Sequence, residues 1–257
     1  MIKKLFLTLF LSSILFACVK KRDLTQNTII AHILSQPDGL HPFNDNSVMR
    51  SYIFNYTQKT LLKLDLVSLE YTPILIKEMP KVSSDNLSFS YEIKEGIFWD
   101  DGSSLTAKDV VFSTKLMLCP LTNNAQIRGN YNSVIKSVEI DPNNKMKFTM
   151  HAQNINWTNR YIFTELFIVQ KSLWDPKGVL DRILFSDLLS DNFKETEVLS
   201  DWFNNYNDAD NGYKPERLLG LGAYQVSEWA ANQYITIEKK KKWWGAEDES
   251  IYNKSYP

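Results

Sequence analysis

Between residues 85 and 118 the chain carries its clearest pattern of hydrophobic and polar positions. Phe89, Tyr91 and Ile93 alternate with polar residues, which is the period of a strand with one buried face. A second apolar run, 97–99, follows a glycine that interrupts the first run. The pattern therefore predicts two short strands separated by a turn.

A helix is predicted directly after these strands. Thr106 stands at the N-cap position with Asp109 three residues later, which is close to a capping box and places a carboxylate at the positive end of the helix dipole. Val110 and Met117 recur at helical spacing, and Pro120 cannot continue a helix. We therefore expect a capped helix that ends before Pro120.

Two adjacent carboxylates, Asp100 and Asp101, precede this helix and Gly102 follows them. Paired carboxylates can serve as a general acid and base. Neighbours on an extended chain point in opposite directions, however, so the two do not easily converge on one bond. Because glycine adopts a positive φ without steric cost, we interpret this pair as part of a turn.

The same reasoning assigns further elements by their apolar spacing and the turn residues between them. We expect a strand at 28–34, a helix at 47–64, a hairpin of strands 134–140 and 145–150, a helix at 157–167, a helical buried face with Trp202, Phe203 and Tyr206, and a hairpin over 227–238.

Composition is that of an ordinary globular protein. The 257 residues are 44% hydrophobic and 23% charged, with a formal net charge of −1. A near-neutral chain has no overall field that attracts nucleic acid, and we expect no nucleic-acid partner. Aromatic residues reach 13%, which fits a ligand-facing surface and a well-filled core equally well. The run of lysines at 239–242 is interpreted as a solvated face.

The first residues have the pattern of a targeting segment. Residues 1–17 begin with two lysines and continue as an apolar run that is short for a membrane span. The run ends in Leu-Phe-Ala-Cys, which resembles a bacterial lipobox, so we expect 1–17 to be a lipoprotein signal peptide and Cys18 to carry the lipid. A plain signal peptide or an uncleaved anchor are the alternatives. Residues 18–27 are expected to form a polar tether, and the other cysteine, Cys119, a buried free thiol.

Residues 93–113 also carry a family resemblance. They read Ile-Lys-Glu-Gly-Ile-Phe-Trp-Asp-Asp-Gly-Ser-Ser-Leu-Thr-Ala-Lys-Asp-Val-Val-Phe-Ser. This resembles the most characteristic segment of the bacterial extracellular solute-binding proteins of family 5, the oligopeptide- and dipeptide-binding proteins of ABC importers. The family usually has a histidine where Asp100 stands. The stretches 71–75, 167–174, 219–226 and 243–245 resemble further family segments, and 167–174 would be a return strand.

The resemblance implies a mixed α/β fold. It is lobe I of a class II-like periplasmic binding protein, with an inserted subdomain. We assign 28–45 and 169–257 to a discontinuous, incomplete lobe I and 46–168 to the inserted subdomain. Family members are much longer and have two lobes, so we expect the second lobe to be missing here. One lobe provides only one wall of the ligand cleft and cannot close around a ligand by a hinge motion. We therefore expect this chain alone to bind ligand weakly or not at all.

The resemblance also implies where ligand would bind. In the family the first mature strand ends at the cleft, where an extended ligand can add its backbone as a strand. His41 stands here where the family usually has aspartate. By position, we expect the ligand-binding residues to be Ser35, Gln36, Pro37, Asp38, Gly222 and Tyr224. An ordinary loop or core role is the alternative for each.

The expected function is that of a substrate-binding lipoprotein of a peptide-class ABC importer. It would capture a peptide or related small solute between two lobes, deliver it to the permease subunits, and sit in the periplasm or cell envelope on a lipid anchor. It would not be an enzyme, and no cofactor or metal is expected.

Two alternatives remain at this point. One is a secreted hydrolase that uses Asp100, Asp101 or His41, although the sequence has no nucleophile motif or metal spacing to support it. The other is a truncated surface lipoprotein that binds no ligand.

Overall fold

The computed structural model describes residues 27–44, 47–164 and 166–248. Residues 35–257 form one compact unit, and the residues up to 34 form a separate one. The predicted signal peptide (1–17), Cys18 with its lipid, and the tether 18–27 except for its last residue lie outside the described residues.

The strand predicted at 28–34 is wrong. These residues have no regular secondary structure, and the side chains of Ile29, Ile30 and Leu34 are exposed. A strand needs a neighbour to pair its backbone N–H and C=O groups. None of the described strands pairs with this segment, so its apolar residues alone do not make it a strand.

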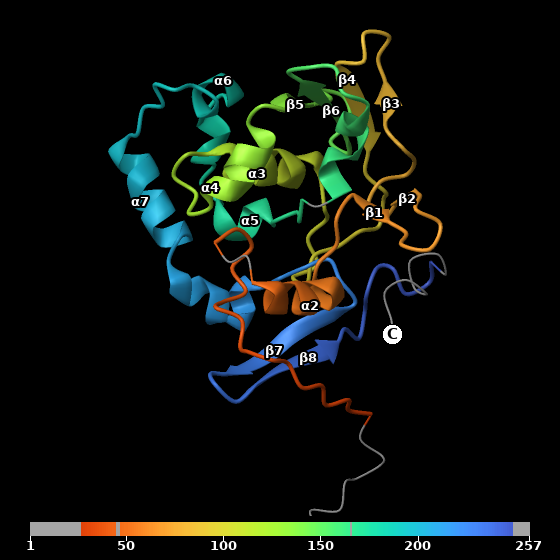
Figure 1. The fold of residues 1–257 in the computed structure, drawn as a ribbon, viewed down its shortest axis with the longest axis vertical. Helices are drawn as coiled ribbons and strands as arrows, with labels where there is room; N and C mark the ends of the chain where they lie inside the picture. The colour runs from red at the N-terminus through yellow and green to blue at the C-terminus, as the bar shows by residue number, and fades with distance from the viewer. Residues whose placement is uncertain (1–26, 45–46, 165, 249–257) are drawn as a thin grey trace, which may run out of the picture. The chain divides into compact units, whose positions relative to one another are not determined.

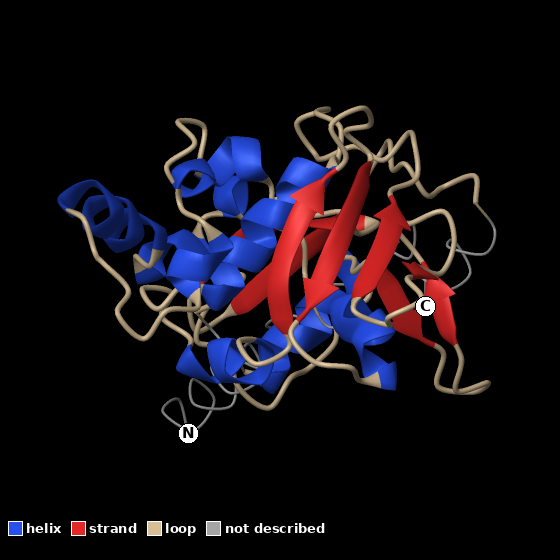
Figure 2. Cartoon of the chain, turned by 90° about the horizontal axis from the view of Figure 1, so that it is seen from above, coloured by secondary structure: helices blue, strands red, loops and turns tan. Residues whose placement is uncertain are grey.

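The main sheet of the compact unit has four antiparallel strands in the order β3–β4–β6–β5. Figure 2 shows strands lying side by side, with helices beside them. Phe89 pairs with Met150 and Tyr91 with Phe148, and all four side chains are buried. The rings of Tyr91 and Phe148 stack with their centroids 4.9 Å apart. The predicted alternation and the predicted hairpin at 134–150 are therefore confirmed. The strands are β3 (Lys81–Val82), β4 (Ser88–Glu92), β5 (Ile135–Ile140) and β6 (Lys147–Ala152).

Helix α3 (Ala107–Leu118) begins and ends where the sequence predicts. The Asp109 carboxylate accepts hydrogen bonds from the backbone N–H of Thr106 at 2.9 Å and from its hydroxyl at 3.2 Å. The same carboxylate accepts the backbone N–H of Lys171 at 2.9 Å, so the cap also holds the start of α5. Cys119, directly after the helix, is buried and free, as predicted.

Short helices complete this part of the unit, and α3 contacts α4, α5, α6 and η2 (Figure 1). Helix α7 buries Phe203 and Tyr206, which confirms the predicted apolar face. The elements are α4 (Ala125–Tyr131), η1 (Trp157–Thr164), α5 (Lys171–Trp174), η2 (Leu180–Arg182), α6 (Phe185–Leu188), α7 (Glu197–Tyr206), η3 (Ala209–Tyr213) and η4 (Pro215–Arg217).

A second, smaller packing group is built on helix α2 (Val48–Thr57). It packs against β7 (Tyr224–Ala230), which forms an antiparallel hairpin with β8 (Tyr234–Lys239), as predicted (Figure 1). This group has its own apolar cluster, whose buried members are Leu40, Phe54, Leu218 and Val226. The larger cluster lies around α3 and the four-stranded sheet.

The helix predicted at 157–167 is the 3-10 helix η1, which ends at Thr164. Three further predicted elements differ from the structure. The helix at 47–64 ends at Thr57, because the residues after it form β1 (Leu62–Leu64), which pairs with β2 (Tyr71–Pro73). The second strand at 97–99 is reduced to one bridge between Phe98 and Ser104, and the return strand at 167–174 to one bridge at Phe167, followed by α5. In each case the pairing partner lies outside the predicted element, and the local pattern of the element cannot show it. No helix in the described part of the chain combines the length and hydropathy that a membrane crossing requires.

Candidate functional site

The first group of predicted ligand residues lies beside the turn of the β7–β8 hairpin. The side-chain oxygen of Gln36 accepts the backbone N–H of Asn232, which is in that turn. The carbonyl of Asp38 accepts the hydroxyl of Tyr213. Pro37 is buried, whereas Ser35, Gln36 and Asp38 are exposed and belong to no strand. The segment is therefore held by side-chain contacts to the hairpin turn and to Tyr213 of η3, and not by strand pairing.

The second predicted group, Gly222 and Tyr224, lies where β7 begins. The N–H of Gly222 donates to the carbonyl of Thr57 at 2.9 Å. A Cβ on Gly222 would lie 2.1 Å from the carbonyl oxygen of Tyr56, and one on Gly220 would lie 2.1 Å from that of Thr57. The ring of Tyr224 meets the ring of Tyr56 edge to face, with centroids 5.7 Å apart. Both glycines allow the backbone before β7 to touch the end of α2.

The structure does not bring these two groups into one pocket. They lie at opposite ends of β7, which has seven residues and so spans about 20 Å. Each group has a clear structural contact of its own. What they share is one strand of the small hairpin, and any common ligand would have to extend along it.

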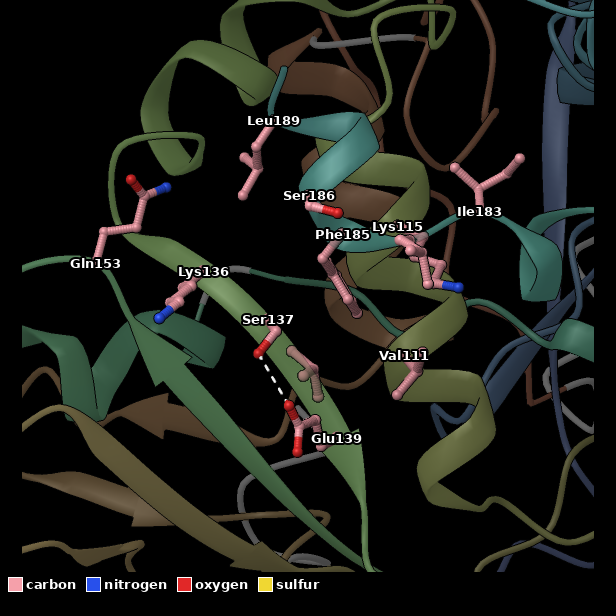
Figure 3. A pocket seen from close by; sticks show the side chains of 12 residues that line it. Val111, Lys115, Lys136, Ser137, Glu139, Gln153, Ile183, Phe185, Ser186 and Leu189 are labelled. Atoms are coloured by element: carbon pink, nitrogen blue, oxygen red, sulfur yellow. Dashed lines mark hydrogen bonds between the residues drawn. The ribbon is translucent and has the colours of Figure 1, made fainter. Parts of the chain in front are cut away.

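A cavity in the described part of the chain lies elsewhere. A volume of about 730 Å³ opens between α3, α6 and the outer strand β5, and Figure 3 shows Lys115, Phe185 and Ser137 among its lining residues. None of the six predicted ligand residues lines it. A smaller cavity of about 170 Å³ is lined by Pro42, Phe43, Arg50 and Phe167, among others, and so adjoins the segment that follows Asp38.

The residues considered for hydrolysis have structural partners. Asp101 accepts the backbone N–H and hydroxyl of Ser103 at 2.9 and 2.7 Å and the amide of Gln170 at 2.6 Å. Desolvation raises the pKa of Asp101, but these hydrogen bonds outweigh it and lower the pKa overall. His41 is buried and contacts the carbonyl of Tyr206 at 2.7 Å through Nε2, while Nδ1 accepts two backbone N–H groups. The turn interpretation of Asp101 fits these contacts.

The structure adds a charged cluster that the sequence did not reveal. Asp100 forms an ion pair with Lys240, whose side chain is only 7% exposed, and Asp100 also accepts the N–H of Gly220 at 3.2 Å. The Lys240 ammonium donates to the carbonyl of Gly220 at 2.6 Å. The prediction of a fully solvated lysine face at 239–242 is therefore wrong for Lys240. Its burial depends on β8 reaching the loop of Asp100, which no local pattern signals.

Lys59 completes this charged cluster. Lys59 is only 9% exposed, and it lies two residues after Thr57, where α2 ends. Burial, together with the neighbouring positive charges of Lys63 and Lys240, lowers the pKa of Lys59 from 10.5 to about 8. Within the residues that the structure describes, no group of three or more His, Cys, Asp or Glu side chains could hold a metal ion.

The family model for bacterial extracellular solute-binding proteins, family 5 Middle, matches residues 70–254. The chain belongs to this family, and the resemblance found in residues 93–113 is confirmed.

Curated and solved relatives agree with this assignment. The oligopeptide-binding protein AppA of Bacillus subtilis (strain 168) is 25% identical over 203 residues, which are 78% of this chain and 31% of that protein. The OppAIV oligopeptide-binding structure from Borrelia burgdorferi matches with a TM-score of 0.61 at 17% identity, covering 83% of this chain and 39% of that one. Listeria monocytogenes OppA bound to peptide matches with a TM-score of 0.60 at 15% identity, covering 81% and 38%.

These comparisons fix the fold class. The mixed α/β structure matches part of the solved binding proteins, which confirms the expected fold class of a partial lobe. The chain spans about a third of the length of these relatives. The relatives are solute-binding proteins and not enzymes, which supports a non-enzymatic role.

Proposed function

We propose that this chain is the substrate-binding lipoprotein of a peptide-class ABC importer. The observation that carries the proposal is the family match over 70–254, together with the similarity to a protein named oligopeptide-binding over 203 residues. The protein would capture peptide in a cleft between two lobes and deliver it to separate permease subunits. It would do so in the cell envelope, anchored through a lipid on Cys18.

The proposed ligand edge follows strand β7. Ser35, Gln36, Pro37 and Asp38 would mark one end of it, and Gly222 and Tyr224 the other. An extended peptide rises about 3.3 Å per residue, so a length of ~20 Å corresponds to about six residues. We further propose that 28–45 and 169–257 belong to lobe I and 46–168 to an inserted subdomain. The small cluster around α2, β7 and β8 would then be the part of the unit closest to ligand.

Ligand extracted from the native protein tests this function. The protein is purified from the membranes of its own cells without denaturation, and bound small molecules are released by acid and identified by mass spectrometry. We expect a mixture of short peptides where the native protein has both lobes of the cleft, since one lobe alone is expected to bind weakly or not at all. A metal chelate or haem in place of peptides would contradict the peptide proposal within the same family.

A variant separates specific ligand from carried-over peptide. Tyr224→Ala removes a half-buried ring at the proposed ligand edge, and Tyr52→Ala removes an exposed ring on α2 as a matched control. The Tyr224 variant is expected to retain less peptide per mole of protein than the Tyr52 variant. Equal retention by both variants would remove Tyr224 from the proposed site.

A further inference from the structure

Lys59, Lys63 and Lys240 bring positive charge together at the end of α2. The backbone of Thr57 touches Gly220 and Gly222, and the Gln58 amide approaches the carbonyl of Leu219 at 3.5 Å. Gly220 in turn holds the Lys240 ammonium. The residue after Gln58 is therefore fixed beside the Lys240 side chain by contacts on both segments.

In the described contacts of Lys240 and Gly220, the negative charge comes from Asp100, which pairs with Lys240. The Asp100 carboxylate forms the ion pair with Lys240 and accepts the Gly220 N–H at 3.2 Å. The charges that act on Lys59 are those of Lys63 and Lys240, and both are positive. A buried ammonium normally has a carboxylate or several acceptors as partners, because burial of an uncompensated charge is costly.

Lys59 lacks such compensation in the described part of the chain. No hydrogen bond or ion pair from a described residue reaches its ammonium, and the ammonium is not one of the polar atoms sealed from solvent. It is thus a cation held at a nearly closed position that still has an opening. A small anion at that opening would replace the missing partner and would also reduce the repulsion from the other two lysines.

We propose that Lys59, with Lys240 and Lys63 beside it, forms a binding site for a small oxyanion, either a carboxylate or a phosphate. Lys59 provides the primary contact, and Lys63 supplies charge from the exposed side. Asp100 keeps Lys240 in place and limits the site to one small anion, because a second negative group would meet the carboxylate. The proposed anion site does not depend on whether the chain binds peptide. If the chain binds peptide, a peptide carboxylate is one source of the anion.

Amine labelling of the unmodified protein tests the site first. Lysines are labelled with a limiting amine-reactive reagent, and the extent at each lysine is read by peptide mass spectrometry. Sodium phosphate, sodium acetate and sodium chloride are compared at equal ionic strength. We expect labelling of Lys59 to fall several-fold in phosphate or acetate, while the exposed Lys108 on α3 is labelled equally in all three. Equal labelling of Lys59 in all three salts would overturn the proposal.

Thermal unfolding of variants tests the site independently. The midpoint temperature of thermal unfolding should rise by a few degrees in the protecting anion relative to chloride, as expected for a ligand that binds the folded state. We expect this rise in the unmodified protein and in the control variant Lys108→Met. The midpoint of Lys59→Met should not rise. A rise of the same size in Lys59→Met would show a general salt effect and would overturn the site.

The same measurements identify the source of the anion. Protection by phosphate alone assigns an inorganic or phosphoryl ligand, and protection by acetate assigns a carboxylate. In the second case a short peptide with a free carboxyl terminus should protect Lys59 and its amidated form should not. These outcomes are independent of peptide content in the native protein, so failure of this site and failure of the proposed function can be told apart.

Discussion

At the scale of single residues, the buried cation at position 59 has the largest predicted electrostatic cost. The pKa of Lys59 falls to about 8 in the folded protein. An unfolded lysine keeps its usual value near 10.4. A base whose pKa is lowered by folding destabilises the folded state most where it is charged in both states, which is below the folded pKa. The penalty then decreases as pH rises toward the unfolded value.

Replacement of Lys59 by methionine should therefore stabilise the protein in a pH-dependent way. At about pH 7, in a buffer without phosphate or carboxylate, we expect Lys59→Met to raise the free energy of unfolding by on the order of 2 kcal/mol. The gain should shrink as pH is raised from about 8 to 10.5. Denaturant unfolding across this range measures it, with Lys108→Met as the control. If the increase in unfolding free energy of Lys59→Met stayed constant with pH, better packing and not removal of the charge would explain the increase.

The glycine before β7 gives a second residue-scale prediction. A methyl group on Gly222 would lie 2.1 Å from the carbonyl oxygen of Tyr56 and 2.5 Å from the carbonyl carbon of Thr57, both backbone atoms that cannot rotate away. We expect Gly222→Ala to cost about 3 kcal/mol of unfolding free energy or more. Gly129→Ala is the matched control, because nothing lies within 4 Å of the added Cβ and the position is in helix α4.

The two glycine variants should have opposite signs. Alanine is the better helix former, so Gly129→Ala should be neutral or slightly stabilising, by up to about 1 kcal/mol. Thermal and denaturant unfolding report both changes. Tolerance of alanine at position 222 with an unchanged midpoint would show that the end of α2 can move away from β7.

At the scale of elements, the pair of Asp100 and Lys240 joins the end of β8 to the loop before α3. Both side chains are largely buried, at 12% and 7% exposure. Removing one member of a buried pair leaves the other charge without a partner, which lowers the free energy of unfolding by about 3–5 kcal/mol. Removing both members can be nearly neutral. We therefore expect Asp100→Asn to destabilise the protein by about 3 kcal/mol and addition of Lys240→Met to recover much of that loss.

A surface pair provides the comparison for this cycle. Lys77 and Glu92 lie 2.7 Å apart, but their side chains are 42% and 29% exposed. Exposed pairs contribute about 0–1 kcal/mol, so Lys77→Met should change stability little. Unfolding free energies of Asp100→Asn, of the double variant with Lys240→Met and of Lys77→Met complete the test. A loss in Asp100→Asn no larger than that in Lys77→Met would show that water replaces the carboxylate at Lys240.

Elements differ in how well sequence predicts them, and the reason is whether the deciding signal lies within the element or in a partner outside it. Helix α3 was predicted with both ends, because its cap at Asp109 and its stop at Pro120 are local signals. The helix at 47–64 was predicted too long, because Leu62–Leu64 pairs with a strand that begins at Tyr71. The strand at 28–34 was wrong because its pattern says nothing about whether a neighbour is present.

The candidate site follows the same rule. The Gly-x-Gly before Tyr224 was recognisable by resemblance, but its close contact with α2 could only be seen in the structure. Burial of Lys59 and Lys240 was not predictable, since lysine usually lies at the surface and nothing adjacent in sequence marks either one as different. The ligand roles of Ser35, Gln36, Pro37, Asp38, Gly222 and Tyr224 stay predictions.

At the scale of the whole compact unit, apolar burial is distributed unevenly. The large cluster around α3 includes Phe89, Phe112 and Phe148, all nearly inaccessible. The cluster around α2 and the β7–β8 hairpin is much smaller, and Trp229 and Ile235 are only partly buried against it. Regions with few buried apolar contacts open at lower free energy than the core. The part proposed to face ligand should therefore be the less stable part of the unit.

Native-state hydrogen exchange can measure this difference amide by amide. We expect the amides of β7 and β8 to exchange through openings that cost less free energy than those of β4 and β6, because a two-stranded hairpin over a small cluster has less burial to lose. Gly222→Ala should lower the protection of β7 and β8 and leave that of β4 and β6 nearly unchanged, since it strains only the contact with α2. Equal loss across all four strands would mean that the unit unfolds as one cooperative block, and the hairpin would then be as rigid a wall for ligand as the central sheet.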